Sequence, residues 1–120
     1  MIYTSYFSKI KGLPSDCVPI SICGRPIPGW TGLEYKRLAP KWSFFRDYKE
    51  GKIGQDGYMS EYNRLVLSGL DPITVRAELE AMVGPGNNPV LVCYEKPGNF
   101  CHRHLVAEWL GPDVIEYNYE

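Results

Sequence analysis

Residues that carry chemistry crowd together where an apolar run gives way to a helical pattern. Glu95 follows the run 89–94, and Cys101, His102 and Arg103 stand at the expected start of the next helix. A thiol near free helix N–H groups and cations is favoured as the thiolate, which is its nucleophilic form. His102 and Glu95 could carry protons, and the planar fork of Arg103 could hold a phosphate or a carboxylate. The cluster predicts an enzyme site for a small anionic substrate, with Cys101 as nucleophile.

The same residues also have purely structural interpretations, and the sequence leaves both open. Cys101 could be a small buried hydrophobe, and His102 could be a core histidine bonded to a backbone carbonyl. Arg103 and Glu95 could simply pair with each other, and Cys93 is expected to pack in the core. The spacing also departs from that of a phosphatase-type loop, in which Cys and Arg lie farther apart than Cys101 and Arg103.

Neither a metal site nor a disulfide is expected. Cys101, His102 and His104 are three possible zinc ligands close together, but the chain has no Cys-x-x-Cys pair. Its four cysteines could form two disulfides by count, yet a chain of this size with an ordinary core does not need them. We therefore expect no metal and no cofactor.

The elements that position the cluster follow from the hydrophobic pattern. The expected strands are 1–7, 18–23, 89–94 and 113–117, and the expected helices are 58–67, the segment from Asp71-Pro72 to the turn 84–89, and 100–110. Residues 31–57 show no clean period and predict a long excursion with one short helix near 42–48. Strands separated by helices imply a single-domain α/β fold, a Rossmann-like three-layer sandwich with a short, mostly parallel sheet and helices on both faces.

In the helix 100–110 the candidate residues share one side. At about 100° per residue, His102 lies in the middle of the apolar face, with Cys101 and Arg103 flanking it, whereas His104 faces water. Side chains lean toward the N-terminus of a helix, so all three candidates point back at the end of the strand 89–94. Ligands of open α/β sheets bind beyond the carboxyl ends of the strands, and a helix N-terminus there offers N–H groups to an anion.

Length and composition exclude several classes of protein. The chain has 120 residues, a net charge of -1, 44% hydrophobic residues and 22% charged residues, which are the values of one ordinary globular domain, residues 1–120. No apolar run approaches the roughly 20 residues needed to cross a bilayer, so no membrane contact is expected. The start lacks the basic flank and long apolar stretch of a secretory signal, which predicts a cytoplasmic location.

The charge is distributed unevenly along the chain. Residues 1–52 carry nine Lys and Arg against four Asp and Glu, whereas residues 53–120 carry four against ten. Between 30 and 57, aromatic residues that begin with Trp30 alternate with lysines and arginines. Such a stretch could stack bases and follow phosphates, or it could form a lid and part of the core. It supports a second hypothesis, a binding module without catalysis that contacts a ligand, a nucleic acid or a host protein.

The residues also resemble a known family. The run Leu91-Val-Cys-Tyr-Glu-Lys-Pro, the Cys101-His-Arg motif and Val106-Ala-Glu-Trp-Leu110 resemble family 488 of the domains of unknown function, small prokaryotic and phage proteins. The N-terminal half is similar too, in Ile20-Ser-Ile-Cys-Gly-Arg25, Pro28-Gly-Trp30, Leu38-Ala-Pro40, and Tyr58 with Tyr62. The resemblance implies a Rossmann-like sandwich with a shared Cys-His-Arg pocket.

Four further residues are candidate ligand contacts. Arg25 matches the family's arginine and ends a strand expected to neighbour 89–94, so it could reach the same pocket as Arg103. Many members of the family have an Asp two residues before this arginine, and Cys23 stands there in this chain. Trp30, Tyr58 and Tyr62 complete the candidate set, although the two tyrosines also fit the core face of a helix. The substrate expected from these residues is a small anion or a nucleotide.

Overall fold

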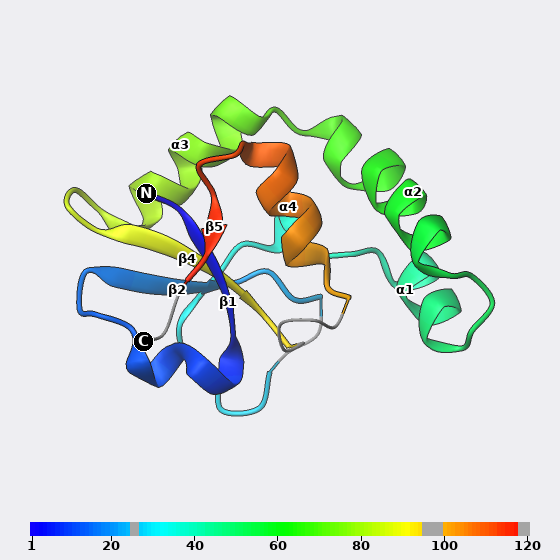
Figure 1. Cartoon of the computed structure of the whole chain (residues 1–120), viewed down its shortest axis with the longest axis horizontal. Coiled ribbons are helices and arrows are strands. Elements are labelled where there is room, and N and C mark those ends of the chain that lie inside the picture. Colours follow the sequence, from blue (N-terminus) through cyan, green and yellow to red (C-terminus); the bar gives the residue numbers. More distant parts are fainter. Residues whose placement is uncertain (25–26, 95–99, 118–120) are drawn as a thin grey trace.

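A parallel five-stranded sheet runs through the molecule (Figure 1). The computed structural model describes residues 1–24, 27–94 and 100–117. Its strands are β1 (Tyr3–Tyr6), β2 (Cys17–Ser21), β3 (Leu33–Glu34), β4 (Asn88–Cys93) and β5 (Ile115–Glu116). They lie in the order β3-β2-β4-β1-β5, and every neighbouring pair is parallel. The predicted α/β class with a parallel sheet is confirmed.

Strand β4 lies at the centre of the sheet because its side chains are apolar on both faces. Val90, Leu91 and Val92 are fully buried, and Cys93 is 1% exposed. This is the pattern of a strand covered on both sides, as the continuous apolar run predicted. The strand ends at Cys93, one residue before the expected end, and the Tyr94 side chain is exposed.

The helices divide unequally between the two faces of the sheet. The α-helices are α1 (Trp42–Lys49), α2 (Gln55–Leu65), α3 (Pro72–Val83) and α4 (His102–Leu110), and the 3₁₀ helices are η1 (Phe7–Gly12), η2 (Lys36–Leu38) and η3 (Leu67–Gly69). All four α-helices bury side chains in the main core, on the face of Leu91 and Cys93. The opposite face, with Val90 and Val92, is covered by residues of η1 and by Trp30. Figure 1 shows the α-helices arching over one side of the strands and η1 on the other.

The order of the connections produces a crevice at the carboxyl end of β4. From β1 the chain moves through η1 to β2 and on to β3, toward one edge of the sheet. From β3 it returns through α1, α2 and α3 to β4 and continues through α4 to β5, toward the other edge. Right-handed connections in opposite directions leave on opposite faces. The connection that follows β4 therefore leaves on one face of the sheet, and the connections that follow its neighbours β1 and β2 leave on the other. The carboxyl end of β4 is thus a topological switch point.

Local sequence signals explain the boundaries of α3 and α4. Asp71 accepts a hydrogen bond from the Thr74 backbone N–H at 2.9 Å, so the predicted cap at the start of α3 is confirmed. Gly84, which follows α3, has φ +84°, a conformation that suits glycine. Helix α4 begins after Cys101, whose backbone is extended, and ends at Gly111 with φ +142°.

The expectation for residues 31–57 is confirmed in part. The short helix expected near 42–48 is α1, but the segment before it is not irregular throughout, because the edge strand β3 and the helix η2 precede α1. Leu65, the last residue of α2, is 38% exposed because the helix ends there and the chain turns at Val66. Among the helices of the described part of the chain, none combines the length and apolar character needed to cross a bilayer.

Candidate functional site

A cavity of about 560 Å³ opens at the carboxyl ends of β2 and β4, at the switch point. Its walls come from the segment after β2, from α1 and α2, and from the start of α4. Cys93, Cys101 and His102 form one end, and Lys49 is the one lysine or arginine among the described residues that line it. The expected position of a site, at the junction of strand 89–94 and the following helix, therefore coincides with a cavity.

Aromatic rings line part of the cavity. The ring centroids of Tyr58 and Phe100 are 5.0 Å apart, those of Tyr48 and Tyr58 are 5.2 Å apart, and those of Tyr48 and Phe100 are 5.4 Å apart. The three rings belong to α1, α2 and the segment before α4, so this wall forms only in the folded chain. The rings pack edge-to-face or tilted against one another, with interplanar angles of 64°, 53° and 88°, so they give this wall an apolar aromatic lining of the kind that ligand pockets use.

The sulfur atoms of Cys93 and Cys101 are bonded to each other. Cys93 ends β4 and Cys101 immediately precedes α4, so the chain returns to the strand end that it left. This corrects the expectation that the chain has no disulfide and that Cys93 is a core residue alone. Cys17 and Cys23 are free and buried, and Cys23 also lines the cavity. Burial raises the pKa of the Cys23 thiol.

His102 is held as a neutral imidazole that faces Cys101. Its Nε2 lies 2.7 Å from the Ile22 carbonyl oxygen and must donate, because a carbonyl only accepts. The other nitrogen, Nδ1, therefore carries no proton, and it lies 3.7 Å from Cys101 Sγ. Burial lowers the pKa of His102 to about 4. The backbone bond expected of a core histidine thus also orients a base toward the sulfur.

Arg103 is fully buried and lies beneath the sulfur atoms. Its Nε and Nη2 donate to the Glu116 carboxylate at 3.1 and 2.9 Å, and its Nη1 lies 3.2 Å from Cys93 Sγ. The side chain is not among the described residues that line the cavity. Its acidic partner in the structure is Glu116 of β5. Burial opposes ionisation of Glu116, but hydrogen bonds from Arg103 and Thr4 outweigh it and lower the pKa of this carboxyl.

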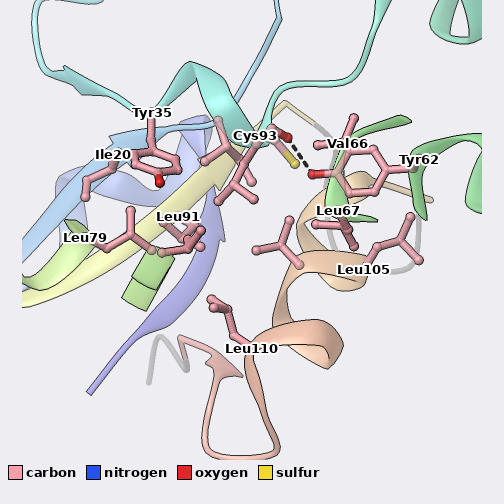
Figure 2. Packing of buried hydrophobic residues seen from close by; sticks show 14 of the residues in the cluster. Ile20, Tyr35, Tyr62, Val66, Leu67, Leu79, Leu91, Cys93, Leu105 and Leu110 are labelled. Carbon is pink, nitrogen blue, oxygen red and sulfur yellow. Dashed lines mark hydrogen bonds between the residues drawn. The ribbon is translucent and has the colours of Figure 1, made fainter. Parts of the chain in front are cut away.

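The remaining candidates are distributed differently from the prediction. Tyr58 lines the cavity. Tyr62 lies behind it in the core, where its hydroxyl donates to the Leu38 carbonyl (Figure 2). Trp30 packs against Phe7 in the opposite core, and among the described lining residues it does not occur. The predicted roles of Arg25 and Glu95 fall outside the described residues.

Several residues of the site were missed from the sequence. Cys93 could have been found, because it ends the buried strand and Cys101 follows it closely. Phe100 gave no separate signal, since aromatic residues are equally common in cores. Tyr48 belongs to the aromatic and basic stretch for which a lid was one interpretation. Glu116 gave none either, because only the pairing of β5 with β1 brings it to Arg103.

The arrangement offers ligand atoms for a metal but surrounds them unfavourably. Cys93, Cys101 and His102 present ligand atoms that all lie within 4.8 Å of one another. Two of these atoms are bonded to each other, and the Arg103 guanidinium beside Cys93 repels a cation. His104, the third ligand considered from the sequence, is exposed, whereas His102 is buried.

Comparison with known proteins gives one match. The model of a family described as the Active DUF488-N3 subclade, DUF488-N3a, matches residues 15–113. The match spans β2 to α4 and includes both bonded cysteines and His102, whereas β1 and β5 lie outside it. No curated protein and no solved structure matches the chain.

Proposed function

From the premise that this chain belongs to the DUF488 family, in its active DUF488-N3 subclade, we propose that it is an enzyme that acts on a small anionic, nucleotide-like substrate in the cavity beside Cys101. The single observation that carries the proposal is the placement of Cys101 and His102 at one end of an aromatic-walled cavity.

The chemistry that suits these residues is nucleophilic catalysis by the reduced form of the protein. When the Cys93–Cys101 bond is open, Cys101 Sγ attacks an electrophilic atom of the substrate and in the same step passes its proton to His102 Nδ1, which lies 3.7 Å from it in the closed form. His102 can then return the proton to the leaving group. The adjacent N-terminus of α4 favours the thiolate over the thiol.

The walls of the cavity fit the two halves of a nucleotide. The rings of Tyr48, Tyr58 and Phe100 offer a stacking surface to a planar base. The N-terminus of α4 and the Lys49 ammonium supply the positive potential for an anionic group. Arg103 contacts Cys93 Sγ and does not bind the anion, since it is buried against Glu116. Arg25 as an anion contact and Glu95 as a proton carrier remain part of the proposal.

The test is ligand binding by the reduced protein. Nucleoside monophosphates and inorganic phosphate are added separately, and the melting temperature is measured after reduction with a phosphine. We expect nucleotides to raise the melting temperature more than phosphate does, because they also occupy the aromatic wall. Lys49→Gln should reduce the shift. Lys52→Gln is the matched control, since Lys52 is exposed and outside the described lining. Equal melting temperatures with and without every nucleotide would overturn the proposed substrate class.

A binding module without catalysis is the second candidate, and one observation favours it. On α1, Trp42 is 57% exposed and its ring lies 6.1 Å from that of Phe45, which lines the cavity. Lys41 and Lys49 are exposed on either side. Such a surface could hold a single strand of nucleic acid. Titration with a short oligonucleotide distinguishes this candidate: binding should weaken steeply as salt rises and should fall in Trp42→Ala. Absence of binding at low salt eliminates it.

A further inference from the structure

The bond between Cys93 and Cys101 joins two sulfur atoms in different surroundings. We propose that these cysteines are a redox-active pair that exchanges two electrons with small thiols and disulfides, with Cys101 as the sulfur that is attacked from outside and Cys93 as the buried leaving group held by Arg103. This activity requires no particular substrate in the cavity, so it goes beyond the function proposed above.

Access distinguishes the two sulfur atoms. Cys101 lies in the segment that enters α4, between the cavity-lining residues Phe100 and His102. Cys93 is 1% exposed and belongs to the central strand, with the fully buried Arg103 against it. Both residues line the cavity, but Cys101 is 6% exposed and Cys93 is 1% exposed, so an external thiolate that enters the cavity reaches Cys101 more readily. Access to one sulfur is a main determinant of the direction of thiol–disulfide exchange.

The charge beside Cys93 favours it as the leaving group. Arg103 Nη1 lies 3.2 Å from Cys93 Sγ, and the guanidinium is fixed there because Glu116 accepts from its Nε and Nη2. A cation held against a sulfur atom stabilises the thiolate that forms when the S–S bond breaks. Exchange is faster when the departing thiol is more acidic. Arg103 is thus a positioning residue for Cys93 and does not contact the incoming thiol.

The reaction balances as two successive exchanges. The first thiol loses its proton to solvent, and its sulfur bonds to Cys101 Sγ while the S–S electron pair leaves with Cys93 as a thiolate. A second thiol also loses its proton to solvent and attacks the sulfur of the first, which releases a small disulfide and Cys101 as a thiolate, and the two protein thiolates take up the two protons from solvent. Two thiols are oxidised and the protein disulfide is reduced by two electrons. A small disulfide reverses every step.

This exchange controls the nucleophile of the proposed enzyme. With the bond closed, Cys101 Sγ cannot attack a substrate, and with the bond open it faces His102 Nδ1. The same two-electron step therefore converts the site between a blocked and a reactive form. Cys23 is free in the same cavity and serves as an internal reference, since it has no bonded partner sulfur.

The experiment traps the attacked sulfur. Full-length Cys93→Ser and Cys101→Ser are incubated with oxidised glutathione, and the modified peptides are identified by mass spectrometry. We expect glutathione on Cys101 in Cys93→Ser and, at the same time point, at least about tenfold less on Cys93 in Cys101→Ser. Cys23→Ser should carry the same amounts of glutathione on Cys93 and Cys101 as the wild type. Glutathione on Cys93 instead, or on neither residue, would overturn the assignment.

A second measurement keeps the proposal testable if a variant does not fold. Wild-type protein is equilibrated in buffers of increasing reduced-to-oxidised glutathione ratio, and free thiols are then alkylated and counted at each cysteine. We expect Cys93 and Cys101 to change together in one two-electron transition while Cys23 stays reduced. Arg103→Lys should slow reduction by about tenfold, because an ammonium replaces the fixed fork. The proposal fails if the two residues stay as thiols in oxidised glutathione alone. No nucleotide is present, so failure of the proposed substrate leaves this result unaffected.

Discussion

A single hydrogen bond gives His102 its chemical character. Because Nε2 donates to the Ile22 carbonyl, Nδ1 keeps its lone pair, and because the ring is buried it stays neutral at pH 7. The residue is therefore at once a core histidine and a base beside Cys101. The two interpretations that the sequence left open are compatible in the folded protein.

Burial of His102 makes stability depend on pH. Its pKa is about 4 in the folded protein, against an ordinary value of 6.5, so the unfolded chain takes up a proton first as the pH falls. The contribution of His102 to the free energy of unfolding is fully present above about pH 6.5 and is lost as the pH falls toward the folded pKa of about 4. We expect a loss of about 2 kcal/mol between pH 7 and pH 5, measured by urea unfolding.

His102→Gln separates this contribution from that of other groups. The amide can still donate to the Ile22 carbonyl but does not titrate, so the loss between pH 7 and pH 5 should largely disappear. His104→Gln is the comparison, since His104 is exposed whereas His102 is buried, and most of the loss should remain in it. An unchanged pH dependence in His102→Gln would contradict the neutral, buried assignment.

The Arg103–Glu116 pair makes a second prediction at this scale. Removing the carboxylate leaves a fully buried guanidinium without its charged partner. We expect Glu116→Gln to cost about 3 kcal/mol in the free energy of unfolding. Glu34→Gln breaks an exposed pair with Lys36 and should cost less than about 1 kcal/mol. Equal stabilities of the two variants in urea would show that the buried pair contributes nothing.

Local sequence signals predicted some of the helices and strands and missed others. Strand β4 was predicted from its apolar run, and the start of α3 was predicted from Asp71 and Pro72, because both signals lie within the element itself. Strand β3 has two exposed residues and exists only because β2 offers an edge for pairing. No local sequence pattern predicts such a strand, and for this reason residues 31–57 were interpreted as an excursion.

The Asp71 side chain at the N-terminus of α3 gives a prediction about stability. Asp71→Ala removes the hydrogen bond accepted from the Thr74 N–H and should destabilise the protein by about 1 kcal/mol. Asp56→Ala is the matched control, because Asp56 lies in the first turn of α2, where no side chain caps the helix. Alkylation of Cys101 should be the same in both variants, as α3 contributes no described residue to the cavity. A Cys101 rate that changed with Asp71→Ala would contradict this separation.

At the scale of the whole molecule, topology decides which predicted residues meet. The position of the site was predictable, because ligands bind at the carboxyl ends of parallel strands and Cys101 begins the helix that follows the central one. The partners were not predictable. Arg103 meets Glu116 only because β5 joins the sheet beside β1, and Cys93 meets Cys101 only because the start of α4 lies at the end of β4.

The same topology explains which ligand candidates were misplaced. Trp30 follows β2, like Cys23, but Trp30 packs on the face of Val90 and Val92, whereas Cys23 lies in the main core. Tyr58 and Tyr62 share one face of α2, yet only Tyr58 is close enough to the strand ends to line the cavity. Residue type and helical spacing identify such candidates but do not say how far along the sheet they lie.

The reactivity of Cys101 in the reduced protein decides whether this residue is the nucleophile. Iodoacetamide is added to Cys93→Ser, which cannot re-form the bond, and alkylation of Cys101 and Cys23 is followed by peptide mass spectrometry. We predict that Cys101 reacts at least about tenfold faster than Cys23, whose thiol is buried in the same cavity without a facing imidazole, and that His102→Gln reduces the difference. Alkylation of Cys101 at the rate of Cys23, unchanged by His102→Gln, would contradict the assignment of Cys101 as the nucleophile.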